Sequence, residues 1–184
     1  GKRAKELAVG ERARTQQDGP DIDFLFAPLK RARLDYMVEK ATEMGVARLR
    51  PVLTRRTTPE RVNLARLRAL ATEAAEQCGI LWVPDVDAQE QLERAIARWP
   101  ASRRLIFCDE DCAEPCPFTA LARVAPGPLA VLVGPAGGFD HDERELISTQ
   151  PFVTRISLGP RILRADTAAV AVLALVNAVL GDWR

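Results

Sequence analysis

The sequence predicts an α/β fold built on a largely parallel sheet with helices packed on its faces. Apolar stretches of strand length, such as Leu105 to Cys108 and Leu129 to Val133, alternate with segments of helical periodicity. Two glycine-containing loops, after Val133 and after Leu158, each follow a strand and precede a helix, as loops of parallel sheets do. With 184 residues, 47% hydrophobic and 28% charged, the composition suits one globular domain and excludes a disordered or fibrous chain.

The first predicted elements are a turn, a strand and a helix. Gln16 to Pro20 is typical of a turn and Ile22 to Ala27 of a strand. We expect the residues before this strand to be the end of a small β domain, and because Gly1 is not a methionine we expect residues upstream of it. From Arg31 to Met44 the apolar positions recur at helical spacing, and Gly45 follows as the expected C-terminal cap.

The middle of the chain continues the alternation. Val46 to Thr54 predicts a strand in which Pro51 favours an edge or strand-end position. Asn63 is expected to cap a second helix, which runs to Cys78, and Asp87 a third. Later elements are expected at residues 105–108 (strand), 118–124 (helix), 129–133 (strand), 140 onward (helix, with Asp140 and Glu143 as a capping box) and 153–158 (strand).

The last predicted helix, Thr167 to Leu180, is apolar on nearly every side and is interrupted by Asn177. A membrane span needs about 20 apolar residues, which is more than this helix has, so we expect no membrane partner. A helix of this kind has to be buried all round. It therefore predicts a core position or the interface of a homodimer.

Charge is nearly balanced overall, with 26 basic and 25 acidic residues, so the net charge gives no argument for a nucleic-acid partner. A local basic surface that follows a phosphate backbone is one interpretation of the basic first third of the chain. Solvated helix and strand faces are the other. The basic residues in this third are Lys2, Arg3, Lys5, Arg12, Arg14, Lys30, Arg31, Arg33, Lys40, Arg48, Arg50, Arg55, Arg56, Arg61, Arg66 and Arg68.

The cysteines and the single histidine give little support to metal or hydrolase chemistry. Cys108, Cys112 and Cys116 follow a spacing that matches no usual zinc pattern, and we expect no metal. His141 lies among charged residues and is expected at a solvated helix start, which leaves nothing for a Ser-His-Asp triad. No basic-then-apolar N-terminal signal is present, so a reduced, cytoplasmic protein is expected.

The glycine loops are where a ligand is expected. The first, Gly134-Pro135-Ala136-Gly137-Gly138-Phe139, follows an apolar strand, and ligands of parallel sheets bind at such strand ends. It is neither a dinucleotide fingerprint nor a P-loop, so a small ligand other than a nucleoside triphosphate is predicted. The second, residues 159–164, contains Arg161 and Arg164, which packing alone does not explain. A turn that needs glycine, and a helix cap at Asp166 or Thr167, are the structural alternatives.

These residues resemble a known family, the ribosomal RNA small subunit methyltransferase E family of the SPOUT superfamily. Gly134 to Phe139 resembles its Gly-Pro-Glu-Gly-Gly-Phe, and Leu158 to Ala168 its Leu-Gly-x-x-Ile-Leu-Arg-x-Glu-Thr-Ala. Lys40 to Val46 and Glu73 to Cys78, followed by Val83-Pro84, resemble two earlier motifs in the same order. The resemblance covers residues 29–180.

The resemblance implies a SPOUT domain, at residues 21–184, whose C-terminal chain forms a trefoil knot that holds S-adenosylmethionine. It implies that residues 1–20 are the remnant of an N-terminal PUA-like β-barrel. It also implies a homodimeric methyltransferase that modifies N3 of a uridine in 16S rRNA of the small ribosomal subunit, with no metal. Knots are exceptions among folds, and periodicity does not reveal them.

The resemblance also implies roles for individual residues. Uridine N3 is a weak nucleophile until its proton leaves, so a base and a positive charge near the uracil oxygens are needed. Arg164 is expected to stabilise the developing negative charge, and Asp166 to act as base or orienting group. The cofactor is expected to be held by backbone groups, with apolar side chains enclosing the adenine. The expected cofactor-binding residues are Leu132, Val133, Gly134, Gly138, Leu158, Gly159, Ile162, Leu163 and Thr167.

Three positions depart from the family pattern. Ala136 and Asp166 each stand where the family has glutamate, and Ile80 stands near a usual arginine. Because Ala136 lacks the carboxylate of the family's glutamate, it favours an alternative function: an RNA-binding or ribosome-associated module with weakened catalysis. A small-molecule α/β enzyme unrelated to RNA is a further alternative.

Overall fold

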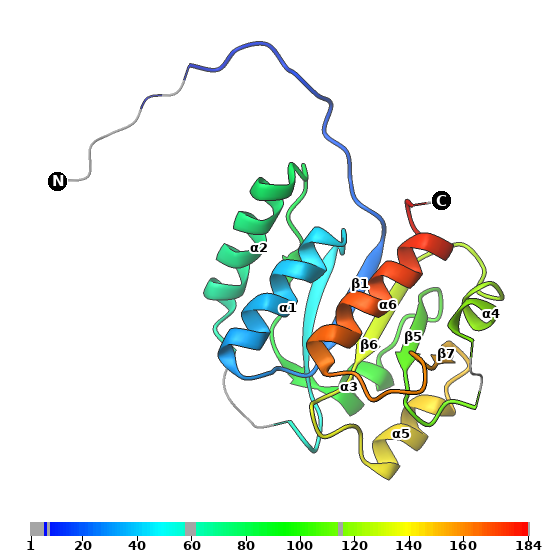
Figure 1. The fold of residues 1–184 in the computed structure, drawn as a ribbon. Coiled ribbons are helices and arrows are strands. Elements are labelled where there is room, and N and C mark those ends of the chain that lie inside the picture. The colour runs from blue at the N-terminus through cyan, green and yellow to red at the C-terminus, as the bar shows by residue number, and fades with distance from the viewer. Residues whose placement is uncertain (1–5, 7, 58–61, 114–115, 184) are drawn as a thin grey trace.

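The computed structural model describes residue 6 and residues 8–57, 62–113 and 116–183. Its strands are β1 (Ile22–Phe26), β2 (Arg48–Leu53), β3 (Asp85–Val86), β4 (Glu90–Gln91), β5 (Arg104–Cys108), β6 (Leu129–Val133) and β7 (Val153–Ile156). They form one sheet of order β3-β2-β1-β6-β5-β7, with β4 also beside β2 (Figure 1). All strand pairs in the described ranges are parallel, which confirms the predicted fold class.

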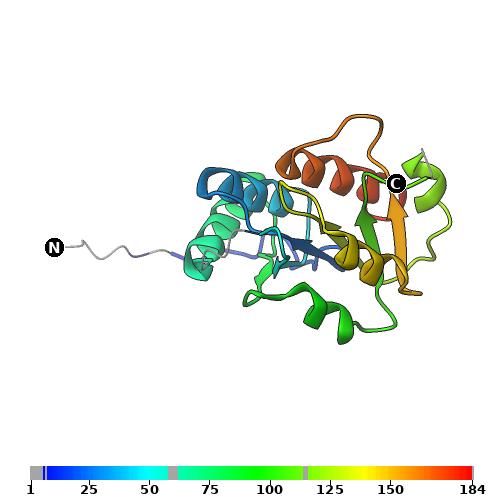
Figure 2. The same cartoon turned by 90° about the horizontal axis from the view of Figure 1, so that it is seen from below.

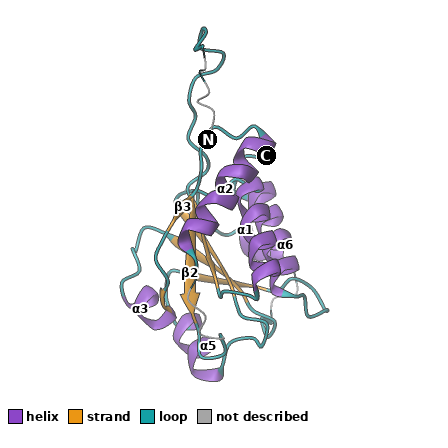
Figure 3. Cartoon of the chain, turned by 90° about the vertical axis from the view of Figure 1, so that its left-hand side faces the viewer, coloured by secondary structure: helices purple, strands orange, loops and turns teal. Residues whose placement is uncertain are grey.

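Helices cover both faces of this sheet, as Figure 2 and Figure 3 show. The helices are α1 (Arg31–Glu43), α2 (Leu64–Cys78), α3 (Leu92–Ala97), α4 (Pro117–Leu121), α5 (His141–Ser148) and α6 (Ala165–Val179). One face carries α1, α2 and α6, and the other carries α3 and α5 (Figure 3). None of the helices in these described ranges is long and apolar enough to cross a membrane.

The core has two layers because the central strands are buried on both faces. Phe24 and Phe26 of β1 stack with their ring centroids 5.3 Å apart, in the layer beneath α1 and α6. Leu25 points to the opposite layer, where it meets Leu132 and Phe107 near α3 and α5. Strands buried in this way carry continuous apolar runs rather than alternating ones.

Several helix ends follow the local signals in the sequence. The side chain of Asn63 accepts a hydrogen bond from the backbone N–H of Arg66, so it caps α2 as predicted. Asp140 and Glu143 form the predicted capping box at the start of α5. Gly45 follows α1 with a φ of +81°, the left-handed conformation expected after a helix end.

Two predicted helix starts are wrong. The third helix begins at Leu92 with Gln91 as its N-cap, because β4 holds the chain extended against β2 until that residue. Asp87 instead forms ion pairs with Arg48 and Arg50, both at 3.5 Å. The last helix begins at Ala165, with Arg164 as its N-cap, so neither Asp166 nor Thr167 caps it.

Pro51 lies in an interior strand and not at the sheet edge. β2 pairs with β1 along one side, where Pro51 is opposite Phe26. On its other side β3 pairs with residues 48–49 and β4 with residues 52–53. Pro51 falls between those two short pairings, where the missing N–H of proline costs no ladder hydrogen bond.

Helix α6 is buried on one side in the isolated chain, which confirms the predicted core position for that side, and burial of the other side by a second copy stays a prediction. Val172, Leu173 and Val176 are fully buried against α1 and the sheet. Asn177, also buried, donates from Nδ2 to the carbonyl oxygen of Met44 at 2.7 Å and ties α6 to the end of α1. The opposite side of the helix is a half-buried to exposed stripe, which we call the α6 stripe: Val170, Ala171, Ala174 and Ala178.

The described residues before Ile22 form an extended segment without helix or strand, and Figure 1 shows it leaving the body of the domain. Its last part runs along the end of α2. Gln16 donates from Nε2 to the carbonyl oxygen of Leu81, and Gly19 lies against the indole of Trp82.

Candidate functional site

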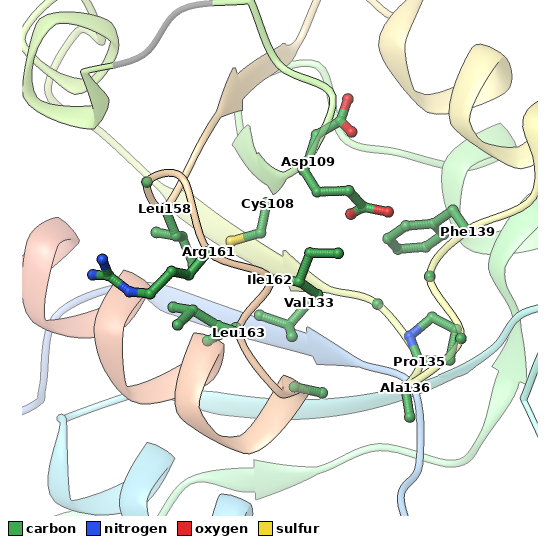
Figure 4. A pocket seen from close by; sticks show the side chains of 17 residues that line it. Cys108, Asp109, Val133, Pro135, Ala136, Phe139, Leu158, Arg161, Ile162 and Leu163 are labelled. Carbon is green, nitrogen blue, oxygen red and sulfur yellow. The ribbon is translucent and has the colours of Figure 1, made fainter.

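A pocket of about 280 Å³ lies at the carboxyl ends of β5, β6 and β7, and we call it the strand-end pocket (Figure 4). The parallel pairing of β5 with both β6 and β7 brings the loops after all three strands to one edge of the sheet. The lining residues are Cys108, Asp109, Glu110, Val133, Gly134, Pro135, Ala136, Gly137, Gly138, Phe139, Leu158, Gly159, Arg161, Ile162, Leu163, Ala165 and Ala168.

The loop after β6 depends on two of its glycines. A Cβ on Gly134 would lie 2.5 Å from the ring of Phe139, so this position has no room for a side chain. Gly138 has a φ of +70°, which L side chains rarely adopt. Ala136 lies between them, exposed and without a positive φ, so the alanine does not change the shape of the loop.

The loop after β7 supplies a second apolar part of the wall. Gly159 turns the chain with a φ of +98°. Ile162, Leu158 and Leu163 line the strand-end pocket from this loop (Figure 4). Ile162 is 90% exposed, which is unusual for a large apolar side chain and leaves an uncovered apolar surface at the pocket.

The loop after β5 is the third wall of the pocket, and it was not among the predicted site residues. Cys108, Asp109 and Glu110 line the pocket from this loop. Burial, together with the neighbouring carboxylate of Asp109, raises the pKa of the Cys108 thiol, which keeps it protonated at neutral pH. The polar residues directly after an apolar strand were the signal in the sequence, since parallel strand ends meet at one edge.

Asp109 holds this wall in place. Its side chain is fully buried, and its Oδ2 accepts a hydrogen bond from Nε of Arg155 in β7 at 2.8 Å. Arg144 of α5 lies 3.2 Å from its Oδ1. One buried carboxylate therefore connects the three elements β5, β7 and α5, and the two guanidinium groups offset the cost of burying its charge.

The segment after β2 braces the loop after β6 from outside the pocket. Arg56 donates from Nη1 to the carbonyl oxygen of Gly137 at 2.7 Å. Arg55 pairs with Asp140 at 2.8 Å and with Asp142 at 2.7 Å, and these hydrogen bonds raise its pKa. Two arginines of the basic first third of the chain thus contact the glycine loop or the helix that follows it.

The predicted cofactor-binding residues fall into two groups. Seven of them line the strand-end pocket: Val133, Gly134, Gly138, Leu158, Gly159, Ile162 and Leu163. Leu132 is not a lining residue, since its side chain points into the opposite core layer, and the predicted contact through its backbone group stays a prediction. Thr167 does not line it either and is exposed on the first turn of α6.

The two predicted catalytic residues lie beside the pocket and not among its lining residues. Arg164 is exposed, and its chain neighbours Leu163 and Ala165 both line the pocket. Asp166 lies in the first turn of α6, where a negative charge interacts favourably with the helix dipole. Its Oδ2 is 3.9 Å from Nε of Arg33.

The remaining sequence predictions concern residues outside the pocket. His141 is exposed at the start of α5, as predicted. No group of metal-ligating side chains occurs within the described ranges. Ile80 follows the glycine that ends α2 and does not line the pocket, so the departure at this position leaves the pocket unchanged.

Together, the fold and the pocket define a class of protein: a parallel α/β domain with a pocket of small-ligand size between glycine loops at its strand ends. Comparison with known families places it more narrowly. Residues 17–177 match the family described as RNA methyltransferase domain, and the chain belongs to this family.

Individual relatives agree with this family. The chain is 27% identical over 178 residues to ribosomal RNA small subunit methyltransferase E of Rickettsia conorii, an alignment that covers 96% of the chain and 72% of the relative. It is 32% identical over 155 residues to the protein of the same name from Synechocystis, covering 82% of the chain and 51% of the relative. This chain thus spans between about half and three quarters of the length of these relatives.

A solved structure gives the same result. The crystal structure of a ribosomal RNA small subunit methyltransferase E from Neisseria gonorrhoeae, bound to S-adenosylmethionine, superposes with a TM-score of 0.82 at 27% identity. The superposition covers 92% of this chain and 71% of that protein.

Proposed function

We propose that this chain is the methyl-transfer domain of an S-adenosylmethionine-dependent methyltransferase that acts on N3 of a uridine in 16S rRNA. Family membership and the names of the relatives support this function. The observation that carries it is the strand-end pocket, built from the glycine loops after β6 and β7.

The strand-end pocket has a size and a lining that suit a ligand with a nucleoside part, such as S-adenosylmethionine. Its volume of about 280 Å³ lies near the lower end of small-molecule sites, which begin at roughly 300 Å³. Gly138 and Gly159 add no side chain to the wall, so a ligand can approach the backbone closely at these two positions. The uncovered Ile162, with Leu158 and Leu163, offers an apolar wall for an adenine ring.

The reaction then needs little from the protein beyond orientation and proton management. The cofactor, when bound, supplies an electrophilic methyl group on a sulfonium. Arg164 faces the uracil and stabilises the negative charge that develops on its oxygens as N3 loses its proton. Asp166 accepts that proton or orients the uracil, and its position directly after the pocket-lining Ala165 is consistent with this role.

Arginines at the border of the pocket support an RNA substrate. Arg33, Arg55 and Arg56 are exposed and contact Asp166, the start of α5 and the glycine loop, respectively. Arg56, which donates to a neutral carbonyl group, offers positive charge to the phosphate groups of a bound RNA, whereas aspartates offset the charges of Arg33 and Arg55. Other basic residues of the first third have structural roles, since Arg50 pairs with Asp23 at 3.2 Å and Arg66 with Asp35.

We also propose that the chain contains the SPOUT knot and that it is divided into two domains. β7 is the edge strand beyond β5, yet α6 packs on α1 near the centre of the sheet. Residues 157–164 therefore connect the edge strand to the centre of the sheet across the ends of β5 and β6, and in a trefoil knot this connection also passes through a loop of the chain. Residues 1–20 belong to an N-terminal PUA-like barrel and residues 21–184 to the SPOUT domain.

The proposal also includes a homodimer and a location in the cytoplasm, where a 16S rRNA substrate occurs. The α6 stripe is the surface that the second copy covers. It consists of alanine and valine side chains that a single chain leaves half-buried or exposed.

Calorimetry with S-adenosylmethionine, followed by methyl transfer to unmodified small-subunit RNA, tests this function. We expect cofactor binding and a methyl group on uridine N3. Binding of cofactor and RNA without transfer would instead support the weakened module that the alanine at position 136 favours. Cofactor binding without RNA binding would support a small-molecule enzyme, and no cofactor binding would contradict the methyltransferase function itself.

A further inference from the structure

Glu110 lies in the wall of the strand-end pocket and has no role in the function proposed above. We infer that its carboxylate accepts hydrogen bonds from the ribose hydroxyls of the bound adenosyl cofactor. This inference rests on the proposed function and assigns to one side chain the recognition of the sugar.

The position of Glu110 relative to the glycine loop carries the inference. It lies two residues after β5, and β5 is the direct parallel neighbour of β6, which leads into the glycine loop. Its Oε1 would be 3.0 Å from a Cβ on Gly138, so the carboxylate lies against the loop and benefits from the absence of a side chain there. In dinucleotide-binding parallel sheets, an acidic residue about 20 residues after the glycine loop accepts a hydrogen bond from the ribose. Glu110 precedes its glycine loop in the sequence, and the parallel pairing of β5 with β6 brings it to the same edge of the sheet as that loop.

One oxygen of the Glu110 carboxylate is hydrogen-bonded to the protein, and the other can accept hydrogen bonds from a ligand. Oε1 accepts a hydrogen bond from Nη2 of Arg144 at 2.7 Å, which restricts the side chain to this wall. Within the described ranges no protein donor reaches Oε2, and the side chain is 44% exposed. A carboxylate has acceptor capacity for several hydrogen bonds, so a pair of neighbouring hydroxyls can be accommodated.

The charge around Glu110 agrees with a positively charged cofactor. Arg144 contacts three carboxylates, those of Asp109, Glu110 and Asp111, and Arg155 contacts Asp109. Three negative charges thus face two positive ones, which leaves one negative charge in this cluster, while Arg161 adds a positive charge elsewhere in the pocket wall. Asp109 is fully buried and engaged by both arginines, so Glu110 is the pocket carboxylate with capacity left for a ligand.

Binding of unreactive ligands to variants tests the inference without methyl transfer. Calorimetry would compare wild type with Glu110→Ala for S-adenosylhomocysteine and for 5′-methylthioadenosine, which keeps the ribose but lacks the amino-acid part. We expect Glu110→Ala to weaken both by about tenfold or more, the usual effect of losing a hydrogen bond to a charged group. A 2′,3′-dideoxy form of 5′-methylthioadenosine should bind equally to the two proteins.

Asp111→Asn is the matched control, because Asp111 also pairs with Arg144 but does not line the pocket. We expect it to bind both ligands as wild type does, and Glu110→Ala to keep the wild-type melting temperature in the absence of ligand. Equal affinities in Glu110→Ala and wild type would overturn the inference and leave the proposed function standing. A loss confined to S-adenosylhomocysteine, or one that persists with the dideoxy nucleoside, would overturn the ribose contact. Failure of the wild type to bind either ligand would instead contradict the proposed function.

Discussion

The ring of Phe139 occupies the space that a side chain at Gly134 would need, since a Cβ there would lie 2.5 Å from the ring. Phe139 cannot easily move away. It is buried, and it packs edge-on against Phe107 with the ring centroids 5.1 Å apart. The turn from β6 into the pocket loop therefore requires a glycine at position 134.

Gly134→Ala is accordingly expected to destabilise the protein by about 1–3 kcal/mol, the usual cost of overpacking a closely packed site, and to weaken cofactor binding. Denaturant unfolding and calorimetry measure the two effects. Gly137→Ala is the control for stability, because its Cβ would lie 3.6 Å from the Arg56 side chain, an ordinary contact. Equal stability of the two variants would show that Phe139 does not constrain position 134.

Ala136→Glu restores the carboxylate of the family pattern at an exposed position in the pocket wall. A hydrogen bond to a charged group changes affinity by about tenfold or more. We therefore expect the variant to raise methyl transfer to RNA, or to tighten cofactor binding, by at least about tenfold. Paired calorimetry and single-turnover methylation measure this, and equal values in both assays would show that position 136 does not decide activity.

Arg164→Ala is expected to abolish methyl transfer and to leave cofactor affinity nearly unchanged, because the exposed arginine is assigned to the uracil and does not line the pocket. The same two assays apply. Arg94→Ala, at an exposed position of α3 on the opposite face of the sheet, should change neither quantity. A collapse of cofactor affinity in Arg164→Ala would contradict the assignment.

Light scattering at micromolar concentration is expected to show a homodimer that covers the α6 stripe. Ala174→Arg places a charge in the middle of this stripe and should yield a folded monomer, because a guanidinium buried in an apolar interface has no partner there. Ala97→Arg, at an exposed position at the end of α3, should remain dimeric. A monomeric wild type would rule out the dimer.

The capping box at the start of α5 predicts a pH dependence. The hydrogen bond from the backbone N–H of Glu143, and then that from Arg55, hold the pKa of Asp140 below its usual value of 3.8. The folded state therefore binds fewer protons than the unfolded state in this range. The stabilisation by Asp140 is fully present above pH 3.8 and is lost as the pH falls through the lower folded-state pKa.

Melting temperatures between pH 7 and pH 3 test this dependence. Asp140→Ala should melt below the wild type at neutral pH, and the difference should shrink as the pH falls below 3.8. Asp140→Asn keeps a cap that does not titrate, so its difference from Asp140→Ala should stay constant over the same range. A wild-type advantage that persists unchanged at the lowest pH would contradict the pKa assignment.

The sequence by itself determined the fold class, the caps at Asn63 and Asp140 and the two glycine loops with most of their lining residues. These features depend on residues close together in the chain: hydrophobic periodicity, cap side chains, and glycine where φ is positive. For the same reason local signals failed at α3, whose start is set by pairing of Glu90 with Val52 in another strand.

Only the tertiary structure determined which distant residues contact the pocket loops. It placed the loop after β5 beside β6, which brought Glu110 to within contact of the glycine loop, and it joined Asp109 to Arg155 across 46 residues of sequence. It also set Arg56 against Gly137, 81 residues away. The order and register of the strands determine these contacts. The hydrophobic pattern of a strand predicts which of its side chains are buried, but it does not predict which strand lies beside it. Local periodicity therefore gives no information about strand order or register.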